Sequence, residues 1–179
     1  TALLLAINIS NEKINSINEV VKMLHQPQTK WSDTAIYINL TQASRAYPFE
    51  WTQGTYDQIK SSGSLRYFDQ SLVNMLNEYA VQVTKVVTRD DIELKYIMEQ
   101  YVPFITDFIN TEITSSIRLN LPLGGEFYYT STEKSTIRKL INKLITIKVT
   151  RSLAIKEYYN LHKKATALLQ LLQKEYHLK

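Results

Sequence analysis

The chain has 179 residues, of which 44% are hydrophobic and 21% charged, and its formal net charge is +4. These proportions are ordinary for a folded globular domain and argue against wholesale disorder. The absence of cysteine excludes thiol catalysis, disulfide bonds and thiolate metal sites. Only four glycines and four prolines are present, which argues against a many-stranded sandwich and favours long helices.

The first stretch of the chain predicts a helix over about residues 2–25. Apolar side chains recur there at alternating steps of three and four residues, which is a heptad-like spacing, and Ser10 interrupts the series. The members of this series are Leu3, Ile7, Ile14, Ile17, Val21 and Leu24. Pro27 ends this helix, and a second helix is expected over about residues 33–47, before Pro48.

Residues 52–69 are the most specific stretch of the sequence. A short helix is expected over about residues 55–62, and Gly63 follows it where a left-handed residue would end the helix. Asp69 is a good N-cap for the long apolar-periodic segment behind it. The stretch therefore predicts a helix–turn corner between two long arms.

This corner also carries the pattern Tyr-x-x-Ile-x-x-Ser-Gly-x-Leu, formed by Tyr56, Ile59, Ser62, Gly63 and Leu65. The pattern resembles the signature of a bacterial family of unknown function. Members of that family have an N-terminal transmembrane helix followed by a mostly helical, coiled-coil-rich extracytoplasmic domain. The resemblance covers about residues 48–79 and supplies no catalytic residues. It implies anchoring through a membrane segment N-terminal to Thr1, on the periplasmic face of the inner membrane, with the cytoplasm as the alternative.

A long helical segment is expected over about residues 69–119, with a kink near Pro103. The apolar seam of its first half consists of Leu72, Leu76, Tyr79, Val83 and Val86. Arg89, Asp90 and Asp91 break this rhythm. The seam then resumes with a shifted phase at Leu94, Ile97, Tyr101, Ile105, Phe108 and Ile109. Fifty helical residues would span about 75 Å, so we expect a protruding antiparallel pair or a bend.

A loop over residues 120–132 precedes the last helix, which is expected over about residues 132–176. Its seam alternates steps of four and three at Ile137, Ile141, Leu144, Lys148, Arg151, Ile155, Tyr158, His162, Ala165, Leu169, Leu172 and Tyr176. Because Lys148, Arg151 and His162 are polar, a partner helix is expected to offer carboxylates or water opposite them. The fold predicted is all-α: a single domain over residues 1–179, an elongated helical bundle of long antiparallel, coiled-coil-like helices with a short helix–turn corner. The seams can be satisfied within the chain or across a homodimer.

No catalytic constellation is visible, which argues against an enzyme. The three histidines are far apart and none has a second ligand at helical spacing, so no metal and no cofactor are predicted. Asp90, Asp91 and Glu93 form an acidic cluster. Adjacent helical residues point in different directions and a calcium loop needs regular oxygen spacing, so we interpret this cluster as a solvated charged patch.

The favoured function is a non-enzymatic interaction, assembly or sensory domain with a protein partner or a second copy of itself. The segment from Glu133 to Lys179 carries eleven Lys or Arg against three Glu, and pairing with the acidic central helix is favoured over nucleic acid. The alternative is polyanion binding through Lys134, Arg138, Lys139, Lys143, Lys156, Lys163 and Lys164. A further alternative is a small-ligand receptor or enzyme whose pocket is lined by Tyr56, Arg66, Tyr67, Tyr128 and Tyr129.

Overall fold

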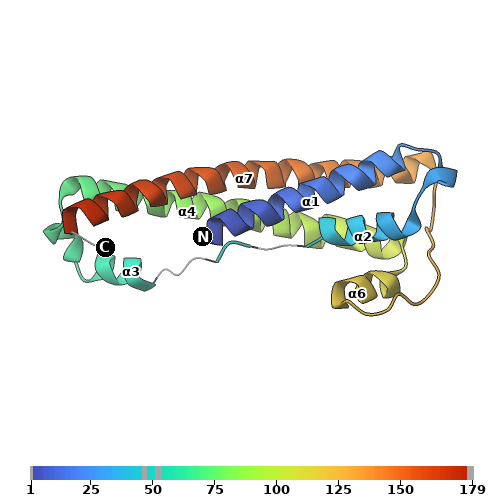
Figure 1. Ribbon diagram of the computed structural model, residues 1–179, viewed down its shortest axis with the longest axis horizontal. Helices are drawn as coiled ribbons and strands as arrows, with labels where there is room; N and C mark the ends of the chain where they lie inside the picture. Colours follow the sequence, from blue (N-terminus) through green and yellow to red (C-terminus); the bar gives the residue numbers. More distant parts are fainter. Residues whose placement is uncertain (1, 46–47, 51–53, 177–179) are drawn as a thin grey trace.

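The computed structural model describes residues 2–45, 48–50 and 54–176 of the chain. Within these ranges the protein is an elongated all-α bundle, which confirms the predicted fold class (Figure 1). Its longest elements run along the axis of the molecule: α1 (Ala2–Leu24), α4 (Gln70–Tyr96) and α7 (Lys134–Tyr176). Helix α7 packs along both α1 and α4. Helix α7 spans the length of the bundle, whereas α4 runs antiparallel to it along part of that length and α1 covers about half of it (Figure 1).

The shorter helices lie at the two ends of this bundle. One end holds the predicted helix–turn corner, and the other holds the helices that follow α1 and α4 (Figure 1). Their bounds are α2 (Asp33–Ala43), α3 (Gly54–Ser61), α5 (Val102–Phe108) and α6 (Thr111–Leu119), with 3-10 turns at Gln28–Lys30 and Ser64–Tyr67.

Side-chain caps determine where several helices begin. Asp69 accepts a hydrogen bond from the Ser71 amide at 2.7 Å, as the sequence predicts, and Ser32 accepts one from Ala35 at 3.4 Å. These oxygens satisfy amides that have no partner inside their own helix. At the corner, Gly63 has φ of 69°, the predicted left-handed conformation that glycine adopts at little cost.

The expected long helix over residues 69–119 is divided in two places. A π-helical segment, Ile97–Tyr101, follows α4 and ends two residues before Pro103, whose nitrogen cannot donate the hydrogen bond that a regular helix needs. Lys143 of α7 donates to the carbonyl of Gln100 in this segment at 2.7 Å. A second break follows α5 at Ile109, which is extended (φ −130°, ψ 167°) and forms an isolated antiparallel bridge with Tyr129.

Tyr37 of α2 holds this end of the bundle together. Its hydroxyl donates to the carbonyl of Tyr128 at 2.6 Å and accepts from the amides of Asn110 and Tyr128 at 3.0 and 3.1 Å. Its ring packs edge-on against Phe127 and Tyr129. One buried side chain therefore orders both the break before α6 and the loop that returns to α7.

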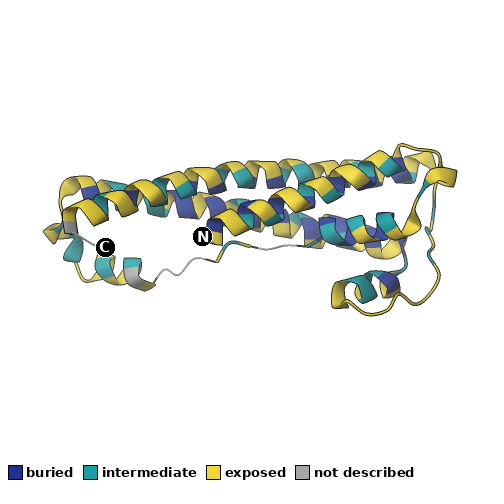
Figure 2. Ribbon diagram, in the orientation of Figure 1, coloured by how far each residue is buried: buried dark blue, intermediate teal, exposed yellow. Residues whose placement is uncertain are grey.

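The apolar interior forms two clusters along the bundle axis. The buried residues lie on the sides of the helices that face one another (Figure 2). The larger cluster lies where α1, α2, α5, α6 and the first half of α7 meet, and includes Ile17, Leu40 and Leu144. The smaller cluster lies between the start of α1, the middle of α4 and the second half of α7, and includes Ile7 and Val83.

The predicted seam of α7 is right in one row and wrong in the other. The row Ile137, Leu144, Arg151 and Tyr158 is buried as expected. The second row lies one residue earlier than predicted, at Leu140, Ile147, Ala154, Leu161 and Leu168. Both rows recur every seven residues, so spacing alone does not separate them. As a result Lys148 and His162 lie half-buried at the edge of the interface rather than in it.

The seams of α1 and α4 also need correction. In α1, Lys13 and Val20 are buried where the sequence predicts Ile14 and Val21. Ser10, which the sequence predicts to interrupt the seam, is buried as well. In α4 the steps of three and four continue through Asp90 and Glu93 without the predicted phase shift. The shift occurs instead at the π-helical segment Ile97–Tyr101, where one turn holds an extra residue.

Candidate functional site

A layer of polar side chains crosses the centre of the bundle between the two apolar clusters. Each long helix contributes two members: Ser10 and Lys13, Asp90 and Glu93, and Arg151 and Tyr158, which we call the charged layer. All of them are buried, and the exposed fractions of Glu93 and Arg151 are 0% and 3%. The two cations and two carboxylates cancel in formal charge, which is the condition under which a protein interior tolerates charged groups.

Glu93 lies between two cations. The Lys13 Nζ is 2.5 Å from Glu93 Oε1, and the Arg151 Nε is 2.7 Å from Glu93 Oε2. The second contact has the distance of an ion pair without the alignment of a hydrogen bond, so these two atoms have no hydrogen-bond partner among the described residues. Arg151 Nη1 lies 3.3 Å from Asp90 Oδ1, which joins the second carboxylate to the same cation.

Backbone and hydroxyl groups complete the charged layer. The Tyr158 hydroxyl lies 2.8 and 2.7 Å from the two carboxylate oxygens of Asp90, and the Phe49 amide donates to Asp90 Oδ2 at 2.9 Å. The Lys13 ammonium also donates to the carbonyl of Arg45 at 2.7 Å. The segment that follows α2 is therefore tied to the layer at two points.

Burial and pairing act in opposite directions on the two cations. Burial lowers the pKa of Lys13, and the neighbouring Glu93 charge only partly opposes that effect. Burial would also lower the pKa of Arg151, but the charge and hydrogen-bonding capacity of Glu93 outweigh it and raise this pKa overall. The pKa of the Tyr158 hydroxyl is raised, first by burial and then by its hydrogen bond to Asp90.

The interpretation of Asp90, Asp91 and Glu93 as a solvated patch is wrong for two of the three. Asp91 is exposed, but Asp90 and Glu93 occupy seam positions and are buried. Sequence reasoning did expect carboxylates opposite Arg151, and this expectation is confirmed. It missed Ser10 and Lys13, whose signal was their seven-residue register with the rest of the α1 seam. Because every charge in the layer faces an opposite charge away from solvent, the arrangement suits helix association rather than catalysis.

The five residues predicted to line a ligand pocket fall into two groups at opposite ends of the bundle (Figure 1). At the corner, the Arg66 guanidinium donates to the exposed Tyr67 hydroxyl at 2.7 Å, and Tyr56 donates to Asn77 at 3.1 Å. At the other end, the Tyr129 hydroxyl donates to Asp33 at 2.8 Å, while half of the Tyr128 side chain is exposed. The structure therefore does not bring the five residues into one pocket.

The seven basic residues predicted for polyanion binding all lie on α7. Lys134, Arg138, Lys139, Lys156 and Lys163 are exposed, whereas Lys143 and Lys164 are half-buried. The Lys164 ammonium pairs with Glu78 Oε2 of α4 at 2.6 Å. The helix from Lys134 to Lys164 is about 45 Å long, so the seven side chains form no compact patch.

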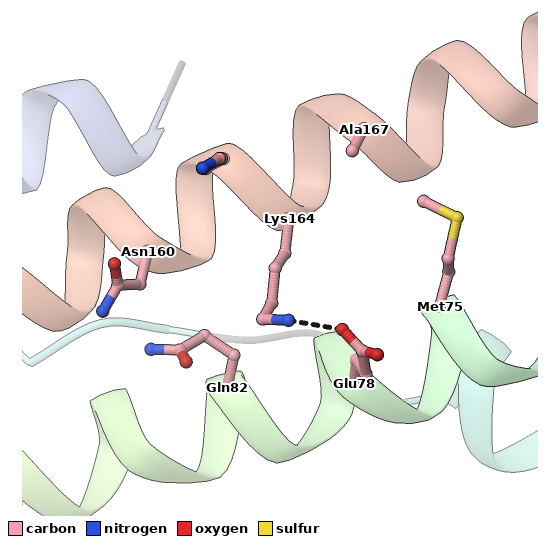
Figure 3. A pocket seen from close by; sticks show the side chains of 7 residues that line it. Met75, Glu78, Gln82, Asn160, Lys164 and Ala167 are labelled. Carbon is pink, nitrogen blue, oxygen red and sulfur yellow. Dashed lines mark hydrogen bonds and ion pairs between the residues drawn. The ribbon is translucent and has the colours of Figure 1, made fainter.

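A groove of about 410 Å³ lies between α4 and α7 beside this pair (Figure 3). Its lining combines Met75 and Ala167 with polar groups, several of which have partners: Lys164 pairs with Glu78, and Gln82 donates to Glu157 at 2.7 Å. The lining carries one carboxylate and two ammonium groups, and the carboxylate of Glu78 already pairs with Lys164, which favours no particular ligand.

A second groove, of about 760 Å³, lies where α1 ends and α7 begins. Its lining includes apolar side chains of both helices and the basic residues His25, Lys134 and Arg138. We call it the α1–α7 groove. Two of the predicted polyanion-binding residues therefore share a concave surface.

Two classes of site are missing from the part of the chain that the structure describes. Among residues 2–45, 48–50 and 54–176, no group of three or more His, Cys, Asp or Glu side chains is arranged to hold a metal ion. Within the same ranges, no helix combines the length and the apolar composition needed to cross a bilayer.

Comparison with known proteins gives no assignment. No protein-family model matches the chain, and neither the curated proteins nor the solved structures contain a significant match. The functional argument therefore depends on the sites described above.

Proposed function

We propose that this chain is a non-enzymatic interaction, assembly or sensory domain, and that it forms the soluble part of a membrane-anchored bacterial protein. The observation that carries the proposal is the charged layer. Lys13, Glu93 and Arg151 lie at the centre of the bundle and pair with one another away from solvent, so these groups hold helices together. Packing of α1, α4 and α7 as a coiled coil belongs to the same proposal, because their buried residues recur at steps of three and four.

The membrane anchor and the periplasmic location are supported by the resemblance of residues 48–79 to the anchored family. The test is fractionation of bacteria that express the complete gene, followed by protease treatment of intact cells and of spheroplasts. The expected result is recovery with the inner membrane and digestion of the domain in spheroplasts but not in intact cells. Recovery in the cytoplasmic fraction would refute the anchored, periplasmic part of the proposal.

The interaction role is tested separately, by photo-crosslinking from exposed apolar positions. Val149 and Leu153 lie on the solvent-facing side of α7, with exposed fractions of 53% and 41%. A photoreactive amino acid at either position is expected to give a discrete crosslinked species in cells, either with a second copy or with a partner protein. Cells irradiated without that amino acid provide the control. Absence of any discrete species from these and other exposed positions would contradict the proposal.

Polyanion binding is the second candidate, and five exposed basic side chains on α7 support it. Phosphate contacts would make the affinity fall steeply as salt rises. Gel retardation of DNA and RNA at low salt tests this candidate. Retardation that is lost in about 0.2 M salt would favour it, and absence of retardation at low salt would eliminate it.

A further inference from the structure

The floor of the α1–α7 groove is apolar and held in place. Leu24 and Ile137 are nearly inaccessible in its depth, with exposed fractions of 5% and 8%, and Trp31 and Ile141 are half-buried beside them. The Trp31 indole donates to the carbonyl of Gln26 at 3.0 Å, and its ring meets that of Tyr129 edge-on at 5.5 Å. Such fixed walls are typical of preformed small-molecule sites, whose volumes lie in the range of about 300–1,000 Å³.

The rim of the groove is basic. His25, Lys134 and Arg138 are its ionisable lining residues, all three are exposed, and none of its lining residues is an Asp or Glu. The acidic residue next in the chain, Glu133, is not part of the lining, and its carboxylate accepts a weak hydrogen bond from Ser135 at 3.5 Å. The first turn of α7 contains no acidic residue either. An anion at the mouth of this groove would therefore meet positive potential over an apolar surface.

We propose that the α1–α7 groove binds a small amphipathic anion, with an aromatic or alkyl body on the floor and one anionic group at Lys134 and Arg138. The apolar floor favours an anion with an apolar body over an inorganic anion, because an inorganic anion gains nothing from contact with apolar walls. The rim favours an anion over a neutral or cationic ligand of the same shape. This inference goes beyond the proposed function, since it requires neither a membrane anchor nor a protein partner.

The other basic residues of α7 distinguish this ligand from an extended polyanion. Lys156 and Lys163 lie on later turns, and no basic side chain other than His25, Lys134 and Arg138 lines the groove. A polyanion would contact the exposed basic side chains along the whole of α7. A small anion would depend on the two at the rim alone.

Fluorescence of Trp31 gives a direct measurement. The chain has two tryptophans, and a Trp51→Phe background leaves Trp31 of the groove as the sole indole, Trp51 lying outside the described residues. The probe is 8-anilinonaphthalene-1-sulfonate, and its neutral counterpart is N-phenyl-1-naphthylamine, which has the same rings without the sulfonate. We expect saturable one-to-one binding of the sulfonate with energy transfer from Trp31, and binding of the neutral amine that is about tenfold weaker or more.

Charge-matched variants locate the site. The double variant Lys134→Gln with Arg138→Gln removes the two rim cations, and the control double variant Lys139→Gln with Lys156→Gln removes two exposed cations of α7 outside the groove. We expect affinity for the sulfonate to fall about tenfold in the first and less than twofold in the second. Circular dichroism of both variants checks that the bundle is folded, which exposed substitutions should not alter.

Three results would overturn the proposal. The first is absence of saturable binding up to millimolar probe. The second is binding of the neutral amine as tight as that of the sulfonate. The third is an equal loss of affinity in the two double variants, which would indicate a general response to the charge of α7. None of these results bears on the membrane anchor or on a protein partner.

Discussion

Arg151 of α7 and Glu93 of α4 face each other at the centre of the bundle, with 2.7 Å between Nε and Oε2, although each stands at a position of its helix seam where an apolar residue is the rule. Such a pair is weak evidence for added stability, because removing two charges from water offsets most of their attraction. Removing one member of the pair has a much larger effect on the free energy of unfolding, because it leaves the other charge buried without a partner.

The first prediction concerns Glu93→Gln. This change leaves Lys13 and Arg151 without their shared counter-ion, so we expect the free energy of unfolding to fall by about 3–5 kcal/mol. Urea denaturation followed by circular dichroism measures it. Asp91→Asn is the matched control, since Asp91 is an exposed neighbour on the same helix. The control should change stability by no more than about 0.5 kcal/mol. Similar effects of the two substitutions would mean that the charged layer is not isolated from water.

The second prediction concerns alkaline pH. Burial is the leading cause of a raised pKa at Tyr37, Tyr79, Tyr101, Tyr129 and Tyr158. From about pH 10 upward, the unfolded chain loses the protons of these hydroxyls while the folded protein keeps them. The folded state therefore becomes less stable relative to the unfolded chain as pH rises. Lys13 acts in the opposite direction, because its pKa is lowered on folding, but it is one group against five. We therefore expect the free energy of unfolding to decline above pH 10.

Two measurements check this pH dependence. Urea denaturation at pH 9, 10 and 11 should give progressively lower midpoints. Absorbance at 295 nm should show that part of the twelve tyrosines of the chain ionises only when the protein unfolds. Titration of all twelve near pH 10 in the folded protein would contradict the raised pKa values of these five hydroxyls.

The third prediction concerns Tyr37→Phe. The substitution keeps the ring that packs on Phe127 but removes the hydroxyl shared by the Asn110 amide and both backbone groups of Tyr128. We expect a loss of about 1–3 kcal/mol in unfolding free energy. Amide hydrogen exchange should accelerate at Asn110 and Tyr128 specifically. The control is Tyr159→Phe, since the Tyr159 side chain is 55% exposed. Unchanged exchange at both amides would show that the hydroxyl does not order these loops.

The fourth prediction compares two glycines of the corner. Gly63 has φ of 69°, so Gly63→Ala forces a side chain into the left-handed region at a cost of about 1 kcal/mol. Gly54 is the first residue of α3, has no positive φ, and a Cβ there would meet open space, so Gly54→Ala should be neutral or stabilise by up to about 1 kcal/mol. Thermal unfolding of the pair measures the contrast. Equal effects would exclude a conformational requirement at Gly63.

Much of the fold follows from local pattern, and the errors have a common cause. The caps, the left-handed Gly63 and one row of α7 depend on residues near one another in sequence, and the structure has them as predicted. Ser10 and Asp90 read as interruptions because polar residues at seam spacing usually face solvent. Their burial depends on partners far along the chain: Arg151 donates to Ser10 from 141 residues away, and Tyr158 donates to Asp90 from 68 residues away. Pairing at that separation leaves no trace in a local periodic pattern.

The candidate sites show the same limit. The sequence predicts Lys134 and Arg138 as anion-binding residues from their charge. It does not predict that they line one groove with Leu24 and Trp31, because that groove forms where the end of α1 meets the start of α7. The sequence predicts a pocket between the helix–turn corner and the aromatic loop, but the length of the bundle keeps Tyr56 and the loop tyrosines apart (Figure 1).

The position of the charged layer between two aliphatic clusters has a consequence for how the three long helices align. A slip of α7 by one heptad would displace Arg151 by about 10 Å, away from Glu93 and into aliphatic surroundings. The two apolar clusters alone would tolerate such a slip, since one aliphatic side chain would replace another. Among the residues that the structure describes, the buried carboxylates are Asp90 and Glu93. The guanidinium is therefore neutralised inside the bundle in a single alignment of the helices.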